Sequence, residues 1–141
     1  MDLLEHLNRS PFRELVGIEI TEAGEGAPAE RLPLNRKHPP RGGACSAQGG
    51  GAFTLADSVG GAAAISLEGR PTPTIDFRID YLRPATDDLR AEGEVTRSGS
   101  ETAVVDVVVT DADGEDVALA RGVYKTSELA VDAPWEIETS G

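Results

Sequence analysis

The chain has 141 residues, of which 25 are acidic and 13 basic, so its formal net charge is −12. This balance argues against a nucleic-acid binder, which needs a basic face, and no apolar run reaches the roughly 20 residues that span a bilayer. The single cysteine excludes an intramolecular disulfide framework and a cysteine-based zinc site.

The N-terminal third predicts a short helix, two strands and a long loop. Residues 2–8 carry three leucines on one side of a helix, and the Ser-Pro pair that follows ends it or starts a further turn. Residues 16–23 alternate apolar and polar side chains, which indicates a strand, and a second extended segment follows at 27–34. Residues 36–47 are rich in proline and glycine and predict an irregular loop. The first residues lack a secretory signal, so we expect a cytoplasmic protein.

Residues 49–66 predict the central helix. Five apolar residues recur there at helical spacing, namely Ala52, Leu55, Ala56, Val59 and Ala63. Because these side chains are small, we expect another surface to pack closely against them. Such a close contact would also tolerate Gly60 and Gly61, which each cost about 1 kcal/mol relative to alanine in a helix.

The second half of the chain predicts strands. From Thr72 the apolar residues recur at every second position, so that one face carries Ile75, Phe77, Ile79 and Tyr81. Further strands are expected at 89–97, 102–110 and 116–126, and the residues at 111–114 predict a hairpin turn. The pattern indicates a single α+β domain over 1–126, with a mostly antiparallel sheet around the helix, and an acidic tail at 127–141.

Common catalytic motifs are missing from the sequence. There is no G-x-S-x-G elbow, no Walker A sequence and no H-E-x-x-H, and neither histidine stands in the context of a triad. Cys45 is interpreted as a small loop residue. The acidic residues at 111–116 resemble part of a calcium loop, but the spacing fails, so we expect a solvated hairpin and no metal site.

One carboxylate stands out, because Asp57 lies in the middle of the apolar helix. It is either an ordinary surface residue or a functional group. The glycines at 49–51, at the start of the helix, favour the second reading, since their bare N–H groups allow a ligand oxygen to approach closely.

Two segments resemble a known family. Gln48-Gly49-Gly50, four residues, and then Leu55-Ala56-Asp57 are similar to the H-G-G-x-x-x-x-L-x-D motif of PaaI-like acyl-CoA thioesterases, and residues 81–85 match that family's Y-L-R-P-A. The resemblance covers about residues 12–126. It implies the hotdog fold, an antiparallel sheet wrapped around a central helix, and thioester hydrolysis without a cofactor other than the coenzyme A of the substrate. The sequence departs from the family at Gln48, where the motif has histidine, and at Gly42, where asparagine or glutamine is usual.

The resemblance also implies roles for individual residues. Asp57 would be general base or nucleophile, Gly49 the oxyanion donor aided by Gln48, and Thr74 a hydroxyl that positions the water. The implied substrate-binding residues are Gly50, Ser58, Arg83, Arg97, Ser98 and Gly99. The two arginines, with Arg41 as a further candidate, would offset the repulsion between an acidic protein and the phosphates of coenzyme A.

The spacing of the motif predicts a site shared by two subunits. Gly49 and Asp57 are eight residues apart, or about 12 Å along a helix, whereas a base and an oxyanion donor must both lie about 3 Å from one reacting group. We therefore expect Gln48 and Gly49 from one subunit to face Asp57 and Thr74 of another in a homodimer, which assembles further to a homotetramer by resemblance to the family.

Other readings stay open at this point. Gln48 is compatible with a catalytically weak or inactive module that binds acyl-CoA or an acyl carrier. A dehydratase or hydratase would need a histidine near the carboxylate, and a purely structural homo-oligomer is a further alternative. Finally, the basic residues are 11 arginines and only Lys37 and Lys125, and an acid-rich, lysine-poor surface is typical of proteins that work in concentrated salt.

Overall fold

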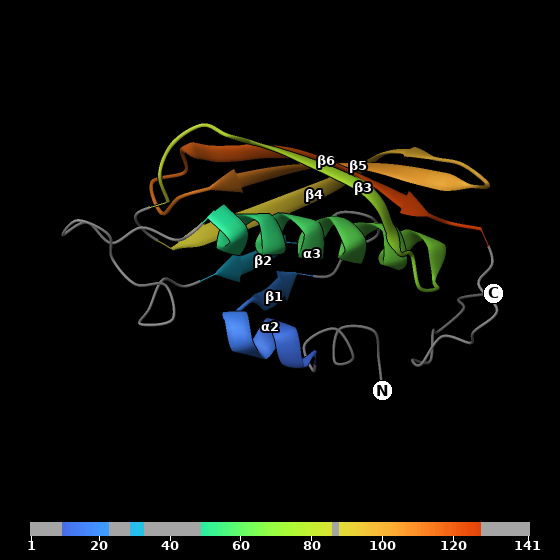
Figure 1. Cartoon of the computed structure of the whole chain (residues 1–141), viewed down its shortest axis with the longest axis horizontal. Helices are drawn as coiled ribbons and strands as arrows, with labels where there is room; N and C mark the ends of the chain where they lie inside the picture. The colour runs from blue at the N-terminus through green and yellow to red at the C-terminus, as the bar shows by residue number, and fades with distance from the viewer. Residues whose placement is uncertain (1–9, 23–28, 33–48, 86–87, 128–141) are drawn as a thin grey trace.

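The computed structural model describes residues 10–22, 29–32, 49–85 and 88–127 (Figure 1). Along the chain its elements are α2 (Pro11–Val16), β1 (Glu19–Glu22), β2 (Ala29–Leu32), α3 (Gly49–Glu68), β3 (Thr74–Tyr81), β4 (Leu89–Ser98), β5 (Thr102–Thr110) and β6 (Asp116–Lys125). The helix expected at 2–8, the loop at 36–47 and most of the acidic tail lie outside the described residues. None of the described helices is both long and apolar enough to cross a membrane.

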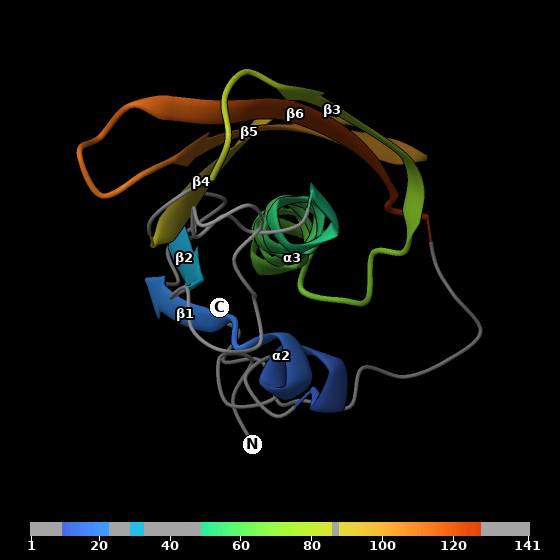
Figure 2. The ribbon, with the colours of Figure 1, turned by 60° about the vertical axis from the view of Figure 1, so that its left-hand side comes forward.

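The strands form one antiparallel sheet in the order β1-β2-β4-β5-β6-β3. Figure 2, which looks nearly along α3, shows the sheet curving around this helix, with α2 on the side of α3 away from β5 and β6. The predicted α+β class and hotdog arrangement are therefore confirmed. The order also leaves β3 at one edge of the described sheet, paired with β6 alone.

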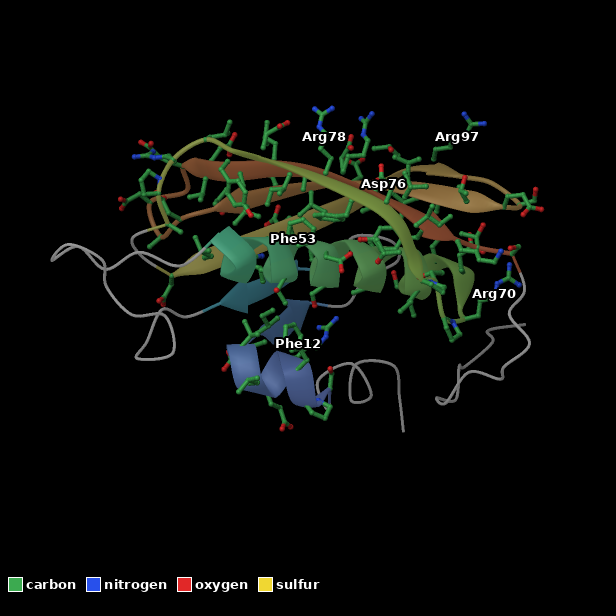
Figure 3. The ribbon with its side chains drawn as sticks, in the orientation of Figure 1. Phe12, Phe53, Arg70, Asp76, Arg78 and Arg97 are labelled. Carbon is green, nitrogen blue, oxygen red and sulfur yellow. The ribbon has the colours of Figure 1, made fainter. Side chains whose placement is uncertain are left out.

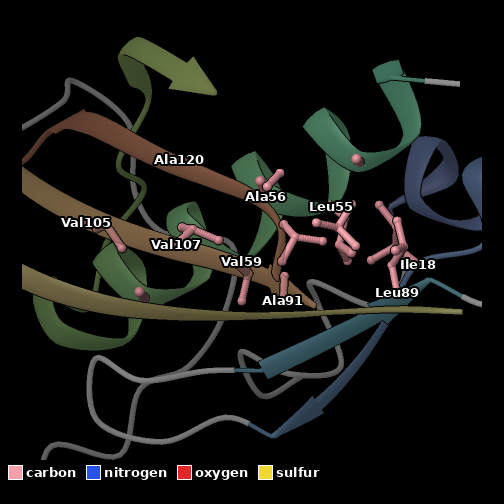
Figure 4. Close-up of a cluster of buried hydrophobic side chains, with 14 of the residues drawn as sticks. Ile18, Leu55, Ala56, Val59, Leu89, Ala91, Val105, Val107 and Ala120 are labelled. Atoms are coloured by element: carbon pink, nitrogen blue, oxygen red, sulfur yellow. The ribbon is translucent and has the colours of Figure 1, made fainter. Parts of the chain in front are cut away.

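The core lies between α3 and the concave face of the sheet (Figure 4). The five residues of the predicted apolar stripe are all buried, and four of them have no exposed surface. Small side chains bring helix and sheet close together: a Cβ added to Gly93 of β4 would lie 3.3 Å from the carbonyl oxygen of Val59 and 3.6 Å from the Cβ of Ala63. The expectation of a closely packed partner surface is confirmed.

The boundaries of the first strand differ from the prediction. The alternating segment was expected to start at Val16, but Val16 is the last residue of α2 and the strand begins at Glu19. Pro11 in the first turn favours a helix there, and Gly17 ends it in the left-handed conformation (φ 93°), with its N–H bonded to the carbonyl of Arg13. Helix capping therefore overrides the period-two pattern at this point.

The apolar face of β3 is only partly buried. Phe77 and Ile79 pack against the core, whereas Ile75 and Tyr81 are 57% and 52% exposed. A bulge between Thr74 and Asp76 shifts the register with β6 at the start of the strand. The single chain thus leaves apolar surface uncovered along its edge strand.

The hairpin turn at 111–114 is confirmed. One carboxylate oxygen of Asp111 accepts hydrogen bonds from the backbone N–H groups of Asp113 and Glu115, at 2.9 and 3.0 Å. This oxygen satisfies backbone donors of the turn, as expected of a residue that initiates it. The described residues contain no group of three or more side chains arranged to hold a metal ion.

Candidate active site

Asp57 lies half-buried in a pocket of about 390 Å³ at the middle of α3. The pocket is bounded by α2, by α3, and by the segment that leads into β3. Its wall includes three aromatic side chains, namely Phe12 on α2, Phe53 on α3 and Tyr124 on β6. Figure 3 places Phe12 between α2 and α3. Phe53 also contacts Phe77 of β3 edge to face, with ring centroids 4.9 Å apart.

The helical repeat explains why these residues share the pocket. Thr54, Asp57, Ser58, Gly61 and Ile65 recur at intervals of three and four residues, so they lie on one side of α3. The apolar stripe occupies the side that faces the sheet. The carboxylate consequently lies at the border of the side that the sheet covers, where residues of β3 and β6 still reach it.

Two hydroxyl groups hold the same carboxylate oxygen. Thr74 Oγ1 donates a hydrogen bond to Asp57 Oδ1 at 3.0 Å, and the Tyr124 hydroxyl lies 3.1 Å from that oxygen and 3.1 Å from the backbone carbonyl of Asp57. Thr74 begins β3, and Tyr124 is its register partner on β6. Among the described residues, no hydrogen bond to Oδ2 is found, so only one of the two carboxylate oxygens has a donor within this part of the chain.

Tyr124 is the site residue that the sequence did not indicate. It belongs to no recognised motif and is 67 residues from Asp57. A tyrosine in an alternating strand suggests a core side chain, and Tyr124 is indeed fully buried. The packing of β6 against α3 brings its hydroxyl to the helix, and the pairing of β3 with β6 places Thr74 beside it.

A second pocket of about 370 Å³ lies toward the N-terminal end of α3. It is lined by Ala52, by Val117 and by residues 81–85, which include the predicted substrate residue Arg83. Arg83 forms an ion pair with Glu115 of the turn before β6. The N-terminal glycines Gly49 and Gly50 belong to this end of the helix, whereas the carboxylate belongs to the first pocket.

Three further predicted substrate residues, Arg97, Ser98 and Gly99, lie on the β4–β5 hairpin at the opposite end of α3. Ser98 Oγ donates to Glu68 at the last residue of the helix, at 2.8 Å, and the carbonyl of Gly99 accepts from Thr126. Arg97 is exposed on the same hairpin (Figure 3).

One chain thus brings together Asp57, Ser58 and Thr74 of the predicted site residues. It does not bring Gly49, Gly50 or the hairpin residues to the carboxylate. Gln48 lies outside the described residues.

Comparison with known proteins gives a consistent picture. Residues 47–118 match the model of the thioesterase superfamily. A proposed esterase of Halobacterium salinarum is 37% identical over 121 residues, which are 78% of this chain and 80% of the relative. The acyl-coenzyme A thioesterase PaaI of Escherichia coli is 32% identical over 109 residues, 76% of each chain. Among solved structures, a Streptococcus mutans protein bound to acetyl-CoA has a TM-score of 0.70 and 28% identity, and covers 78% of this chain and 88% of its own.

Proposed function

The chain belongs to the thioesterase superfamily, and on that premise we propose that it hydrolyses an acyl-CoA thioester to the free acid and coenzyme A. The observation that carries the proposal is the Asp57 carboxylate, which lines a pocket with one oxygen held by two hydroxyls and the other without a donor among the described residues. Relatives that are an acyl-CoA thioesterase and a protein bound to acetyl-CoA support the substrate class.

The proposed reaction uses Asp57 in one of two ways. As general base, it removes a proton from a water molecule whose oxygen adds to the thioester carbonyl; the C–S bond then breaks, and the thiolate of coenzyme A leaves and takes up a proton. As nucleophile, its carboxylate displaces the thiolate to form an anhydride, which water then hydrolyses. In either case the Gly49 amide, at the positive end of the helix dipole, stabilises the oxyanion, a contribution of about 10²–10³ in rate for one donor.

We propose that the complete site needs two copies of the chain. Gly49 and Asp57 are eight residues apart on α3, about 12 Å along the axis, so one thioester cannot contact both within one helix. The outer edge of β3, which no other described strand pairs with, carries the exposed Ile75 and Tyr81 and is suited to joining a second copy. A two-fold axis at this edge would bring the N-terminal pocket of one chain to the Asp57 pocket of the other, and so create two equivalent sites.

Coenzyme A recognition is assigned to the arginines. Arg83 borders the N-terminal pocket, and Arg97 is exposed on the β4–β5 hairpin beside Ser98 and Gly99. In a two-chain site, cations at the ends of both helices would offset the repulsion between the net charge of −12 and the phosphates. Gly50 and Ser58 would contact the acyl-pantetheine part.

The test is release of free thiol from a panel of acyl-CoA substrates in molar salt. We expect turnover by the wild-type chain and a loss of at least a hundredfold in Asp57→Asn, with acyl-CoA binding retained. Asp113→Asn is the matched control, because it removes the same charge from the exposed hairpin turn. Equal rates in wild type and Asp57→Asn would remove this carboxylate from the mechanism.

One feature favours a second candidate, a hotdog module that binds acyl-CoA or an acyl carrier with little or no turnover. Gln48 replaces the motif histidine, and its amide can donate a hydrogen bond but cannot carry charge. Tight binding of acyl-CoA without thiol release by wild type, together with a large gain of rate in Gln48→His, would favour this candidate over the enzyme.

A further inference from the structure

We infer that Tyr124 is a positioning residue for Asp57 and that Oδ2 is the carboxylate oxygen that acts on the thioester; this rests on the proposed function. Tyr124 is fully buried on β6, and its hydroxyl lies 3.1 Å from Asp57 Oδ1, the oxygen that also accepts from Thr74 at 3.0 Å. Two donors on one oxygen fix the rotation of the carboxylate.

The ring of Tyr124 is confined from two sides by glycines. A Cβ added to Gly60 of α3 would lie 2.3 Å from the tyrosine oxygen, and one added to Gly122 of β6 would lie 2.5 Å from ring atom Cε2. No real Cβ approaches so closely, so both positions exclude larger residues while the tyrosine keeps its place. Glycine is unfavourable inside both helices and strands, and here its absence of a side chain makes room for the phenol.

The hydroxyl proton has two acceptors at equal distance, the carboxylate and the backbone carbonyl of Asp57. A charged acceptor forms the stronger hydrogen bond, so the carboxylate takes the proton when Asp57 is ionised. The backbone carbonyl of Asp57 stays part of the backbone of α3, whichever acceptor takes the proton. Tyr124 therefore contacts Asp57 and does not need to touch the substrate, which would meet Oδ2 on the pocket side.

The inference predicts a specific kinetic change in Tyr124→Phe. This variant keeps the ring between the two glycines and removes only the donor. With Thr74 alone on Oδ1, the carboxylate is held less firmly, and we expect kcat to fall roughly tenfold to a hundredfold while KM stays within about twofold. A side chain that only fills the core would leave kcat unchanged in this variant, so an unchanged kcat, or a change confined to KM, overturns the inference.

A second measurement tests the contact without relying on turnover. Denaturant unfolding of wild type, Tyr124→Phe, Asp57→Ala and the double variant forms a double-mutant cycle. We expect the double variant to lose less stability than the sum of the single variants, because each removes the same hydrogen bond. Additive losses would overturn the inference.

The two experiments separate this inference from the proposed function. If Asp57→Asn abolishes thiol release and Tyr124→Phe does not lower kcat, the inference fails and the thioesterase assignment stands. If Asp57→Asn leaves the rate unchanged, the assigned role of the carboxylate fails, and the positioning role of Tyr124 fails with it even where the cycle shows a contact.

Discussion

Asp106 and Arg121 form a two-point ion pair between β5 and β6 on the outer face of the sheet, with Arg121 Nε 2.7 Å from one carboxylate oxygen and Nη2 3.1 Å from the other. The hydrogen bond from Arg121, helped by its charge, holds the pKa of Asp106 below its ordinary value against a smaller opposing effect of burial. Both side chains are more than a third exposed, so solvent screening keeps the contribution to stability small.

This pair predicts a pH-dependent effect of Arg121→Gln. Because the folded pKa of Asp106 is lowered, the stabilisation is present above the ordinary carboxyl pKa of about 3.9 and is lost as pH falls through the folded value. We expect the variant to have a slightly lower denaturation midpoint than wild type at pH 7 in dilute salt, and a difference that shrinks as the pH falls below the ordinary carboxyl value. Arg97→Gln, which removes the same charge from an exposed residue, is the control; a deficit that persists at low pH would contradict the assignment.

Asp57 could be singled out from the sequence because its position relative to three glycines is a local pattern. The contact between Thr74 and its carboxylate followed from the family resemblance. Tyr124 could not be found, because its contact depends on how β6 packs against α3, which no local pattern encodes. One of the two donors to Oδ1 therefore comes from a long-range contact that could not be predicted from the sequence.

At the scale of elements, α3 combines a buried apolar stripe with two adjacent glycines that have different surroundings. Gly60 is buried against the oxygen of Tyr124, whereas a Cβ on Gly61 would meet only ring atom Cε1, at an ordinary 3.6 Å. The sequence suggested that both glycines provide room. Only Gly60 has a contact too short for a Cβ.

The surroundings of the two glycines predict opposite effects on stability when each is replaced by alanine. Gly60→Ala is expected to destabilise the fold by about 1–3 kcal/mol, because the methyl group overpacks a confined ring. Gly61→Ala is expected to be neutral or to stabilise by up to about 1 kcal/mol, from the better helix propensity of alanine. Denaturant unfolding measures both, and equal effects of the two substitutions would show that the Tyr124 ring yields easily.

How well each helix or strand could be predicted depended on how regularly its apolar residues recur. The stripe of α3 and the alternation of β4, β5 and β6 predicted those elements to within one or two residues at each end. Val16 was misassigned because a glycine in the left-handed conformation ends α2 just after it. Ile75 and Tyr81 belong to a regular alternation that nevertheless leaves them exposed, since strand periodicity indicates a face but not what covers it.

At the scale of the whole molecule, the exposed apolar edge of β3 predicts self-association. We expect Ile75→Glu to shift the chain from dimer toward monomer and to lower thiol release in parallel, because the site shared by two chains would be lost. Sedimentation velocity at several concentrations checks the assembly. Leu67→Glu is the matched control, since Leu67 is 47% exposed and belongs to α3 instead of β3. A monomeric variant that keeps its activity would contradict the shared site.

The charge of the molecule predicts a requirement for salt. With a net charge of −12, the carboxylates repel each other over a distance that shrinks to about 3 Å at 1 M salt. We expect the unfolding temperature to rise from dilute buffer to molar KCl, and a non-ionic osmolyte at matched water activity to reproduce only part of the rise. A fold that is equally stable in dilute buffer would contradict adaptation to concentrated salt.

α2 borders the pocket on the side of α3 that lies away from the sheet (Figure 2). Phe12 and Arg13 form part of the pocket wall, yet none of the six residues of α2 is buried. Mutations on this helix can therefore reshape the cavity with little disturbance of the packing between α3 and the sheet. Changes in this one surface segment can therefore alter the preference for one acyl group over another, while α3 and the sheet stay the same.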